Sequence, residues 1–146
     1  MRIVLDANVF IAALLKNGGN ASHAMGVALR EHTVIVPEQF VKDLYSFMQQ
    51  AQKKGVKVNP DDFLREIAYL QSKGAIQVVK TRGSLSLSPH EADNHYLGAA
   101  VEYNAPMLLS GDAYLTNREI KEKAYREYGI TILHPHEFLE WHKNGG

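Results

Sequence analysis

The chain contains no cysteine. This absence excludes a disulfide framework and a thiolate zinc site. Long apolar runs are also missing, because none approaches the roughly 20 residues that a membrane-spanning helix needs. The N-terminus lacks the basic, apolar and small-residue order of a signal peptide. We therefore expect a cytoplasmic protein with no membrane association.

An excess of charge of one sign is lacking too, because 16 basic residues balance 16 acidic ones. Proteins that coat nucleic acid through its phosphates usually carry a basic excess, so the composition argues against non-specific coating. It does not exclude an enzyme whose acidic residues hold metal ions. The 146 residues are 45% hydrophobic and suffice for one substantial core, so we expect a single domain over residues 1–146.

Short apolar runs alternate along the chain with segments in which apolar residues recur at steps of three and four. The runs predict strands at residues 2–5, 34–36, 75–79, 106–110 and 129–133. Asn59-Pro60 is a typical helix start, with asparagine as the cap and proline at the first helical position. Strands that alternate with helices are parallel and joined by right-handed crossovers. The expected fold class is α/β, with three α/β/α layers around a parallel sheet of about five strands.

One acidic residue occupies the first junction between a predicted strand and a predicted helix. In MRIVLDANVFIAALL, Asp6 directly follows the strand and precedes the helix. Ligand sites of open parallel sheets lie beyond the carboxyl ends of the strands, which favours a functional role for Asp6. The alternative is that Asp6 only caps the helix, because aspartate is a favoured N-cap residue. Acids at equivalent junctions elsewhere would favour the functional role.

Three further segments supply such acids. LLSGDAYL places Asp112 just beyond the fourth predicted strand, and SPHEADNHYLGAA places Glu91 and Asp93 in the first turn of the preceding helix. VPEQFVKDLYSF places Asp43 about two turns into the helix after the second strand. Carboxylates gathered at one end of the sheet repel each other and raise their own pKa values unless cations lie between them. Oxygen ligands of this kind suit Mg²⁺ or Mn²⁺.

The order of these motifs resembles the PIN domain family. The resemblance covers nearly the whole chain and is carried by the segments MRIVLDANVFI, VPEQFVKDLYSF, ADNHYLGAA, MLLSGDAYL and TILHPHEFLEW. It implies a ribonuclease that depends on Mg²⁺ or Mn²⁺, with the acids at one end of a parallel sheet. Similarity to the VapC-like group implies a toxin with an antitoxin protein as partner. PIN domains often dimerise, so a homodimer is expected.

The resemblance also implies the site residues. The catalytic and metal-binding acids are those that match the family's motifs, namely Asp6, Asp43, Asp93 and Asp112. Asn8 and Ser110 are expected to support them, and Ser110 stands where the family has threonine. Asp43 stands where the family usually has glutamate, whose side chain is one methylene longer.

Several further residues are possible accessories to this site. Glu91 is expected mainly to close a capping box, Ser88-Pro89-His90-Glu91. A role as an accessory metal ligand is the second expectation for this residue. Arg82 and Arg118 lie in segments that flank the expected acidic edge and are candidates for phosphate contact. Glu38 is a rival to Asp43, although a glutamate in the first turn of a helix also suits the helix dipole.

The histidines and tyrosines favour structural roles. His134 and His136 have no third ligand nearby in the sequence and are typical of an exposed helix start rather than of a zinc site. His95 is expected at the rim of the acidic site, two residues after Asp93. Packing is the role expected for Tyr96, Tyr103 and Tyr114, and the alternative is that a tyrosine at the rim of the site stacks on a base.

The function expected from these residues is metal-assisted hydrolysis of RNA phosphodiester bonds. One alternative is a non-catalytic PIN-like module that binds RNA or a protein. A second is a phosphatase with Asp6 as nucleophile, which is disfavoured because such sites usually have a second aspartate where this chain has Asn8. A partner surface is expected on the helices between residues 16 and 71, at the apolar residues Phe47, Met48, Phe63 and Tyr69.

Overall fold

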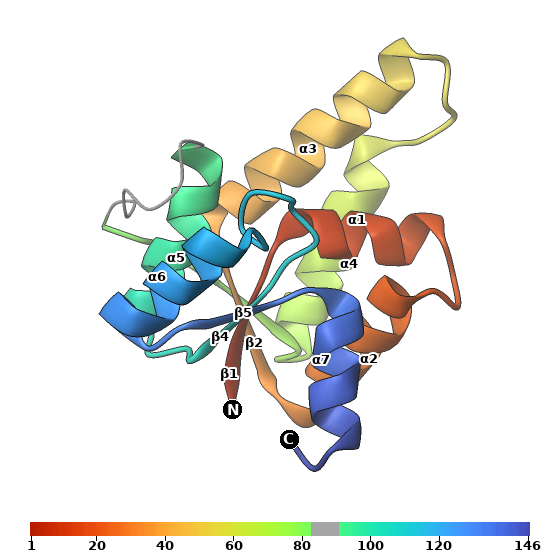
Figure 1. Ribbon diagram of the computed structural model, residues 1–146. Coiled ribbons are helices and arrows are strands. Elements are labelled where there is room, and N and C mark those ends of the chain that lie inside the picture. Colours follow the sequence, from red (N-terminus) through yellow and green to blue (C-terminus); the bar gives the residue numbers. More distant parts are fainter. Residues whose placement is uncertain (83–90) are drawn as a thin grey trace.

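The computed structural model describes residues 1–82 and 91–146 and is built around a five-stranded sheet (Figure 1). The strands lie in the order β3-β2-β1-β4-β5, and every pairing between neighbours is parallel. Their bounds are β1 Arg2–Leu5, β2 Thr33–Pro37, β3 Ile76–Val79, β4 Met107–Leu109 and β5 Thr131–Leu133. The predicted parallel sheet is therefore confirmed.

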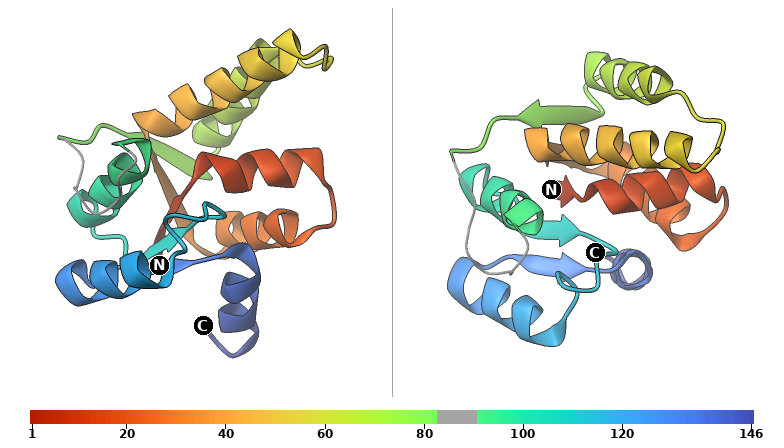
Figure 2. Two further views of the ribbon diagram at one scale, coloured as in Figure 1. Left: turned by 45° about the horizontal axis from the view of Figure 1, so that its top comes forward. Right: turned by 90° about the horizontal axis from the view of Figure 1, so that it is seen from above.

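Helices cover both faces of this sheet. The helices are α1 Ala7–Leu15, α2 Asn20–Glu31, α3 Glu38–Lys53, α4 Pro60–Ser72, α5 Glu91–Glu102, α6 Arg118–Tyr128 and α7 Pro135–Lys143. Helices α5 and α6 lie on one face, and α1, α2 and α7 lie on the other (Figure 2). The predicted three-layer arrangement is confirmed. The joined ends of α3 and α4 project away from the sheet (Figure 1). Within the described ranges, no helix is long and apolar enough to span a bilayer.

The local sequence explains where these elements begin and end. Ile3, Val4 and Leu5 are fully buried, as expected for a parallel strand that is covered on both faces. The Asn59 side chain accepts a hydrogen bond from the Asp61 backbone N–H at 3.0 Å, so the predicted start of α4 is confirmed. Helix α6 ends at Gly129, whose φ of 70° suits glycine at a helix terminus.

The strand order reverses at β1. The chain runs from β1 outward to β2 and β3, and it then returns to β4 on the other side of β1. Leu5 of β1 lies beside Leu109 of β4, so the residues that follow these two strands leave the sheet at the same level. Such a reversal point is where open parallel sheets form ligand sites. Asp6 and Ser110 are the first residues beyond it.

One of the four apolar residues expected on the surface was wrongly assigned. Met48 is fully buried, because it follows Phe40 and Leu44 at steps of four and shares their core-facing side of α3. Phe47 and Tyr69 remain exposed at 37% and 56% of their surface. Phe63 is half-buried against the core.

Candidate active site

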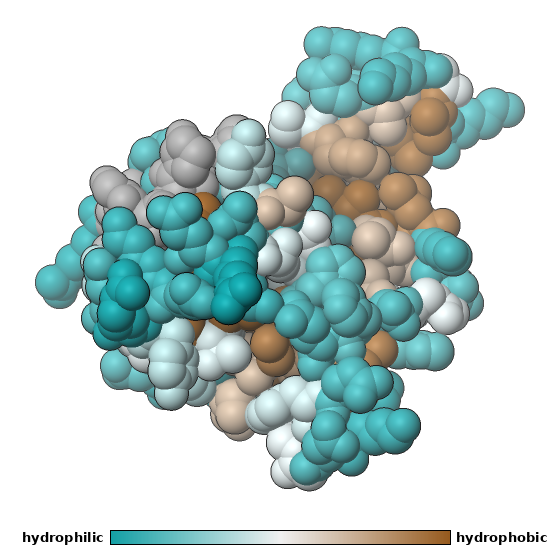
Figure 3. Space-filling view, in the orientation of Figure 1, coloured by the Kyte–Doolittle hydropathy of each residue, from teal (hydrophilic) through white to brown (hydrophobic). Residues whose placement is uncertain are grey.

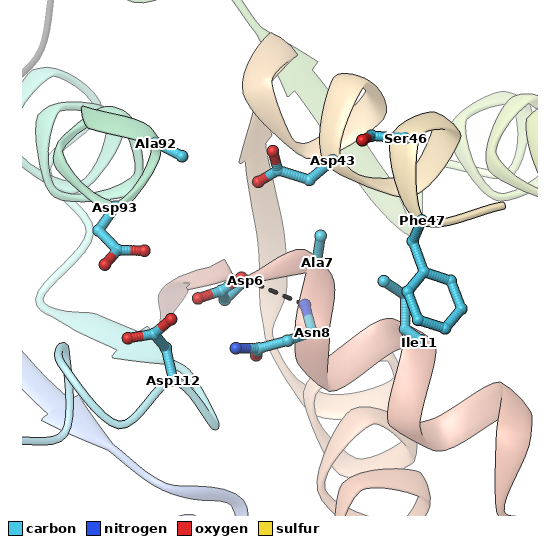
Figure 4. A pocket seen from close by; sticks show the side chains of 10 residues that line it. All are labelled: Asp6, Ala7, Asn8, Ile11, Asp43, Ser46, Phe47, Ala92, Asp93 and Asp112. Atoms are coloured by element: carbon cyan, nitrogen blue, oxygen red, sulfur yellow. Dashed lines mark hydrogen bonds between the residues drawn. The ribbon is translucent and has the colours of Figure 1, made fainter. Parts of the chain in front are cut away.

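Four aspartates from four segments line one open pocket beyond the strand ends (Figure 4). Asp6 comes from the β1–α1 junction, Asp43 from α3, Asp93 from α5 and Asp112 from the loop after β4. The pocket has a volume of about 420 Å³. Its other lining residues are Ala7, Asn8, Ile11, Ser46, Phe47 and Ala92. None of the ten is basic, so the pocket is strongly acidic.

Asp6 lies at the bottom of the pocket and is only 5% exposed. Its Oδ1 accepts a hydrogen bond from the Asn8 backbone N–H at 3.2 Å, which makes Asp6 the N-cap of α1. Its Oδ2 accepts a hydrogen bond from the Ser110 hydroxyl at 2.8 Å. The Asp6 side chain therefore both caps α1 and lines the pocket.

The strand-end loop that carries Asp112 is fixed to the Asp6 segment. The Ser110 hydroxyl, which donates to Asp6, also accepts from the Asp112 backbone N–H at 3.0 Å. The Asn8 side-chain oxygen accepts from the Gly111 backbone N–H at 3.1 Å. Asp112 Oδ1 itself accepts from the backbone N–H groups of the next turn, those of Tyr114 and Leu115. Asn8 and Ser110 therefore join the Asp6 segment to the loop that carries Asp112.

Asp43 is held at the pocket wall by two side chains. The Gln39 amide donates to its Oδ1 at 2.8 Å, and the Tyr96 hydroxyl donates to its Oδ2 at 2.7 Å. Asp93 lies opposite, in the first turn of α5, and is 7% exposed. Figure 4 shows Asp43 and Asp93 on opposite walls, with Asp6 and Asp112 below them.

Burial raises the pKa of Asp6 from 3.8 to about 7. The hydrogen bonds from Ser110 and Asn8 act in the opposite direction, whereas the neighbouring charges of Asp93 and Asp112 raise the pKa further. Without a cation nearby, the carboxylate form of Asp6 is thus unfavourable. A positive charge in the pocket would reverse this preference.

The donor chemistry of the pocket fits a divalent cation with oxygen ligands. All the acidic groups are carboxylates, and the most buried of them has a pKa raised by burial and by its acidic neighbours. Within residues 1–82 and 91–146, no three potential ligands lie close enough to enclose an ion by themselves. Mg²⁺ commonly retains several waters and uses only one or two carboxylates directly, so the all-oxygen lining of this pocket suits such an ion without a closed set of protein ligands.

The accessory residues predicted from the sequence do not line this pocket. Glu91 is exposed and lies 3.7 Å from the His95 ring. The other residues of its proposed capping box, 88–90, lie outside the described residues. The Arg118 side chain is 92% exposed and pairs with Glu122. Arg82 lines a separate pocket, with Lys80, Glu102 and Tyr103.

Glu38 and the histidine pair, which were the alternatives to the aspartates as ligands, do not line the acidic pocket either. Glu38 lines a different pocket, between α3, α4 and β3. The rings of His134 and His136 contact each other, with their Nδ1 atoms 2.7 Å apart at the start of α7. Neither histidine is among the lining residues of the acidic pocket.

Sequence reasoning missed the two side chains that hold Asp43. The sequence predicts packing or base stacking for Tyr96 and no role for Gln39. Only Gln39 could have been found from helical spacing, because it precedes Asp43 by four residues on the same helix, whereas Tyr96 lies 53 residues away on α5. Spacing alone does not show which acid a neighbouring side chain contacts.

Comparison with known proteins assigns the family. A model of the PIN domain family matches residues 2–114, and the chain therefore belongs to that family. No curated protein matches this sequence.

Solved structures share the fold, among them the following two. A chain of the VapBC2 complex from Rickettsia felis, bound to a DNA fragment from its promoter, superposes with a TM-score of 0.57 at 10% identity. That match covers 92% of this chain and 98% of the other. A domain of a functionally unknown protein from Methanocaldococcus jannaschii has a TM-score of 0.53 at 20% identity, covering 91% and 89% of the two chains. At these identities the likeness supports the fold alone.

Proposed function

We propose that this PIN-domain protein is an endoribonuclease that hydrolyses RNA phosphodiester bonds with Mg²⁺ or Mn²⁺. The observation that carries the proposal is the convergence of Asp6, Asp43, Asp93 and Asp112 on one acidic pocket. A purely structural role explains this poorly, because carboxylates gathered in one pocket repel each other, and the charges of Asp93 and Asp112 raise the pKa of the buried Asp6. Family membership supports the same proposal.

Asp6, Asp93 and Asp112 are the residues proposed to hold the ion, some of them through its bound waters, and Asp43 completes the acidic lining. A divalent ion, when bound, lowers the pKa of water and stabilises negative charge on the attacked phosphate. The chain's own contribution is to fix the carboxylates in place. Ser110 does this for both strand-end acids, because it donates to Asp6 and accepts from the backbone of Asp112. No side chain acts as a covalent nucleophile in this scheme.

The open shape of the pocket favours single-stranded RNA or RNA loops. A flexible backbone can bend so that one phosphate approaches Asp6, whereas a rigid duplex cannot. The exposed Phe47 ring and Ile11 both line the pocket, on the side away from Asp93 (Figure 4). An apolar ring in this place can stack on a base of the bound strand.

Cleavage of single-stranded RNA should require added metal. We expect no cleavage after the protein is treated with a chelator, and cleavage once Mg²⁺ or Mn²⁺ is restored. Because water is the proposed nucleophile, the products should carry a 5′-phosphate and a 3′-hydroxyl. These ends can be identified by ligation. A 2′,3′-cyclic phosphate would show instead that the RNA's own 2′-hydroxyl attacks, which contradicts this mechanism.

We also propose that the protein is the toxin of a toxin–antitoxin pair. The VapBC2 complex, which shares the fold, supports this role. An apolar surface adjoins the acidic pocket on this chain and comprises Ile11, Leu14, Leu15 and Phe47, of which Leu14 and Leu15 are 42% and 61% exposed. Figure 3 shows apolar residues gathered over α1 and the adjoining part of the α3–α4 pair. A partner that covers this surface could place an arginine among the carboxylates.

A protein encoded beside this gene should inhibit the cleavage. At fixed Mg²⁺, activity should fall in proportion to added partner and reach zero at a fixed stoichiometry, which sizing of the complex would give. The same sizing tests whether the free chain is the expected homodimer. A strictly monomeric chain that no neighbouring gene product binds would contradict the toxin role. It would leave the nuclease proposal intact.

A further inference from the structure

We propose that Tyr96 is a positioning residue of the active site, which holds Asp43 at the pocket through its hydroxyl group. This inference rests on the proposed nuclease function. It assigns to Tyr96 a role that the family match does not supply. The aromatic ring belongs to the hydrophobic core, whereas the hydroxyl reaches the edge of the acidic pocket.

The Tyr96 hydroxyl connects three separate parts of the site. It donates to Asp43 Oδ2 on α3 at 2.7 Å and accepts from the backbone N–H of Ala7, the first residue of α1, at 3.3 Å. Ala7 directly follows Asp6. Tyr96 itself lies on α5, three residues after Asp93, on the same side of the helix. One oxygen atom therefore ties the Asp43 wall to the segments that carry Asp6 and Asp93.

Geometry and burial give this hydroxyl a fixed direction. Tyr96 is 1% exposed, so its ring is enclosed by the core and cannot move toward solvent. Because the Ala7 N–H can only donate, the hydroxyl accepts from Ala7 and donates its own proton to Asp43. Gln39 donates to the other Asp43 oxygen at 2.8 Å. The carboxylate is thus held from both sides.

The short side chain of Asp43 gives this contact its importance. Similarity to the PIN family leads one to expect a longer glutamate at this position, so an aspartate must be held more closely to serve the same pocket. Packing alone would require only a ring, which phenylalanine also provides. The hydroxyl is therefore the part of Tyr96 that acts on the site, and it acts through Asp43.

The Tyr96→Phe variant tests the role, because it removes only the hydroxyl. We expect it to weaken Mn²⁺ binding, measured by calorimetry, by about tenfold, as is common when a group that orients a metal ligand is lost. The kcat for RNA cleavage should fall by a similar factor with little change in KM. Tyr103→Phe is the matched control. Tyr103 lies just beyond the end of α5, and its hydroxyl donates to the Lys80 carbonyl, away from the pocket. This control should behave as wild type.

A double-mutant cycle tests whether the effect passes through Asp43. Asp43→Ala should weaken Mn²⁺ binding by itself, and adding Tyr96→Phe should then cause no further loss. The assignment is overturned if Tyr96→Phe binds Mn²⁺ and cleaves RNA like wild type, or if its full effect persists without Asp43. If Tyr96→Phe does not fold, the Asp43→Ala variant decides alone. Wild-type Mn²⁺ affinity in Asp43→Ala would show that Asp43 does not contribute to metal binding, and the proposed role of Tyr96 would then be overturned.

The two proposals fail in distinguishable ways. A wild-type protein that neither binds Mn²⁺ nor cleaves RNA overturns the nuclease proposal and this assignment together. A wild-type protein that does both, with an unchanged Tyr96→Phe variant, overturns only the assignment. The affinity measurement needs no RNA, so it reports on the position of Asp43 independently of turnover.

Discussion

Asp6→Asn is expected to reduce RNA cleavage by at least about a thousandfold, because metal-assisted catalysis contributes several kcal/mol of transition-state stabilisation. Asp6 is the most buried acid of the pocket and the one nearest the sheet. Asparagine keeps its shape but removes the charge that would attract a cation. The measurement is the initial rate of cleavage of a labelled single-stranded RNA at saturating Mg²⁺.

A matched control shows whether the loss of cleavage is specific to Asp6 or follows the replacement of an aspartate outside the pocket. Asp62 lies in the first turn of α4, is 64% exposed and is paired with Arg65 outside the pocket. Asp62→Asn should cleave RNA at the wild-type rate. Wild-type activity in Asp6→Asn would refute the proposed mechanism, provided that the variant is folded by circular dichroism.

In the metal-free protein, the contribution of Asp6 to stability should fall as the pH rises from about 4 to above 7. In the folded state the pKa of Asp6 is about 7, because burial disfavours its charged form, whereas the ordinary value is 3.8. The folded state therefore binds the proton more tightly than the unfolded state. The resulting stabilisation is complete below pH 3.8 and is lost as the pH rises through about 7. This stabilisation amounts to a few kcal/mol at most, since a difference of one pKa unit between the folded and unfolded states corresponds to about 1.4 kcal/mol.

Urea unfolding across this pH range measures the effect, with Asp6→Asn as the comparison. The variant lacks the titrating group, so the difference in unfolding free energy between the two proteins isolates Asp6 from all other groups. The variant should be the more stable protein at pH 8. Added Mg²⁺ should stabilise wild type at pH 8 and leave the variant nearly unchanged. An equal pH profile for both proteins would contradict the high pKa.

The sequence was sufficient to predict the parallel sheet and the meeting of its acidic segments. Asp6 and Asp112 each follow an apolar strand within three residues, and parallel strands carry such residues to the same edge. Asp93 could be included because it opens the helix that leads to β4. Asp43 depended on the family pattern, since its place two turns into α3 does not by itself fix where it points.

Contacts between distant segments could not be predicted in this way. Arg82 and Arg118 lie in segments that flank the acidic edge, yet the structure places both outside the pocket. Proximity in sequence does not determine the direction of a long side chain. Tyr96 shows the converse, because its hydroxyl contacts a residue 53 positions away. An aromatic residue in a helical pattern predicts burial, but it does not reveal what a polar atom at its end will meet.

The rate of RNA cleavage as a function of Mg²⁺ concentration tests the central proposal most directly. Wild type and Asp6→Asn should be purified side by side, because a contaminating ribonuclease would appear equally in both. We predict no wild-type cleavage in chelator, saturable cleavage as Mg²⁺ is added, and a rate for Asp6→Asn that is at least about a thousandfold lower at every concentration. Cleavage by wild type that persists in chelator, or that is equal in the two proteins, would contradict the account.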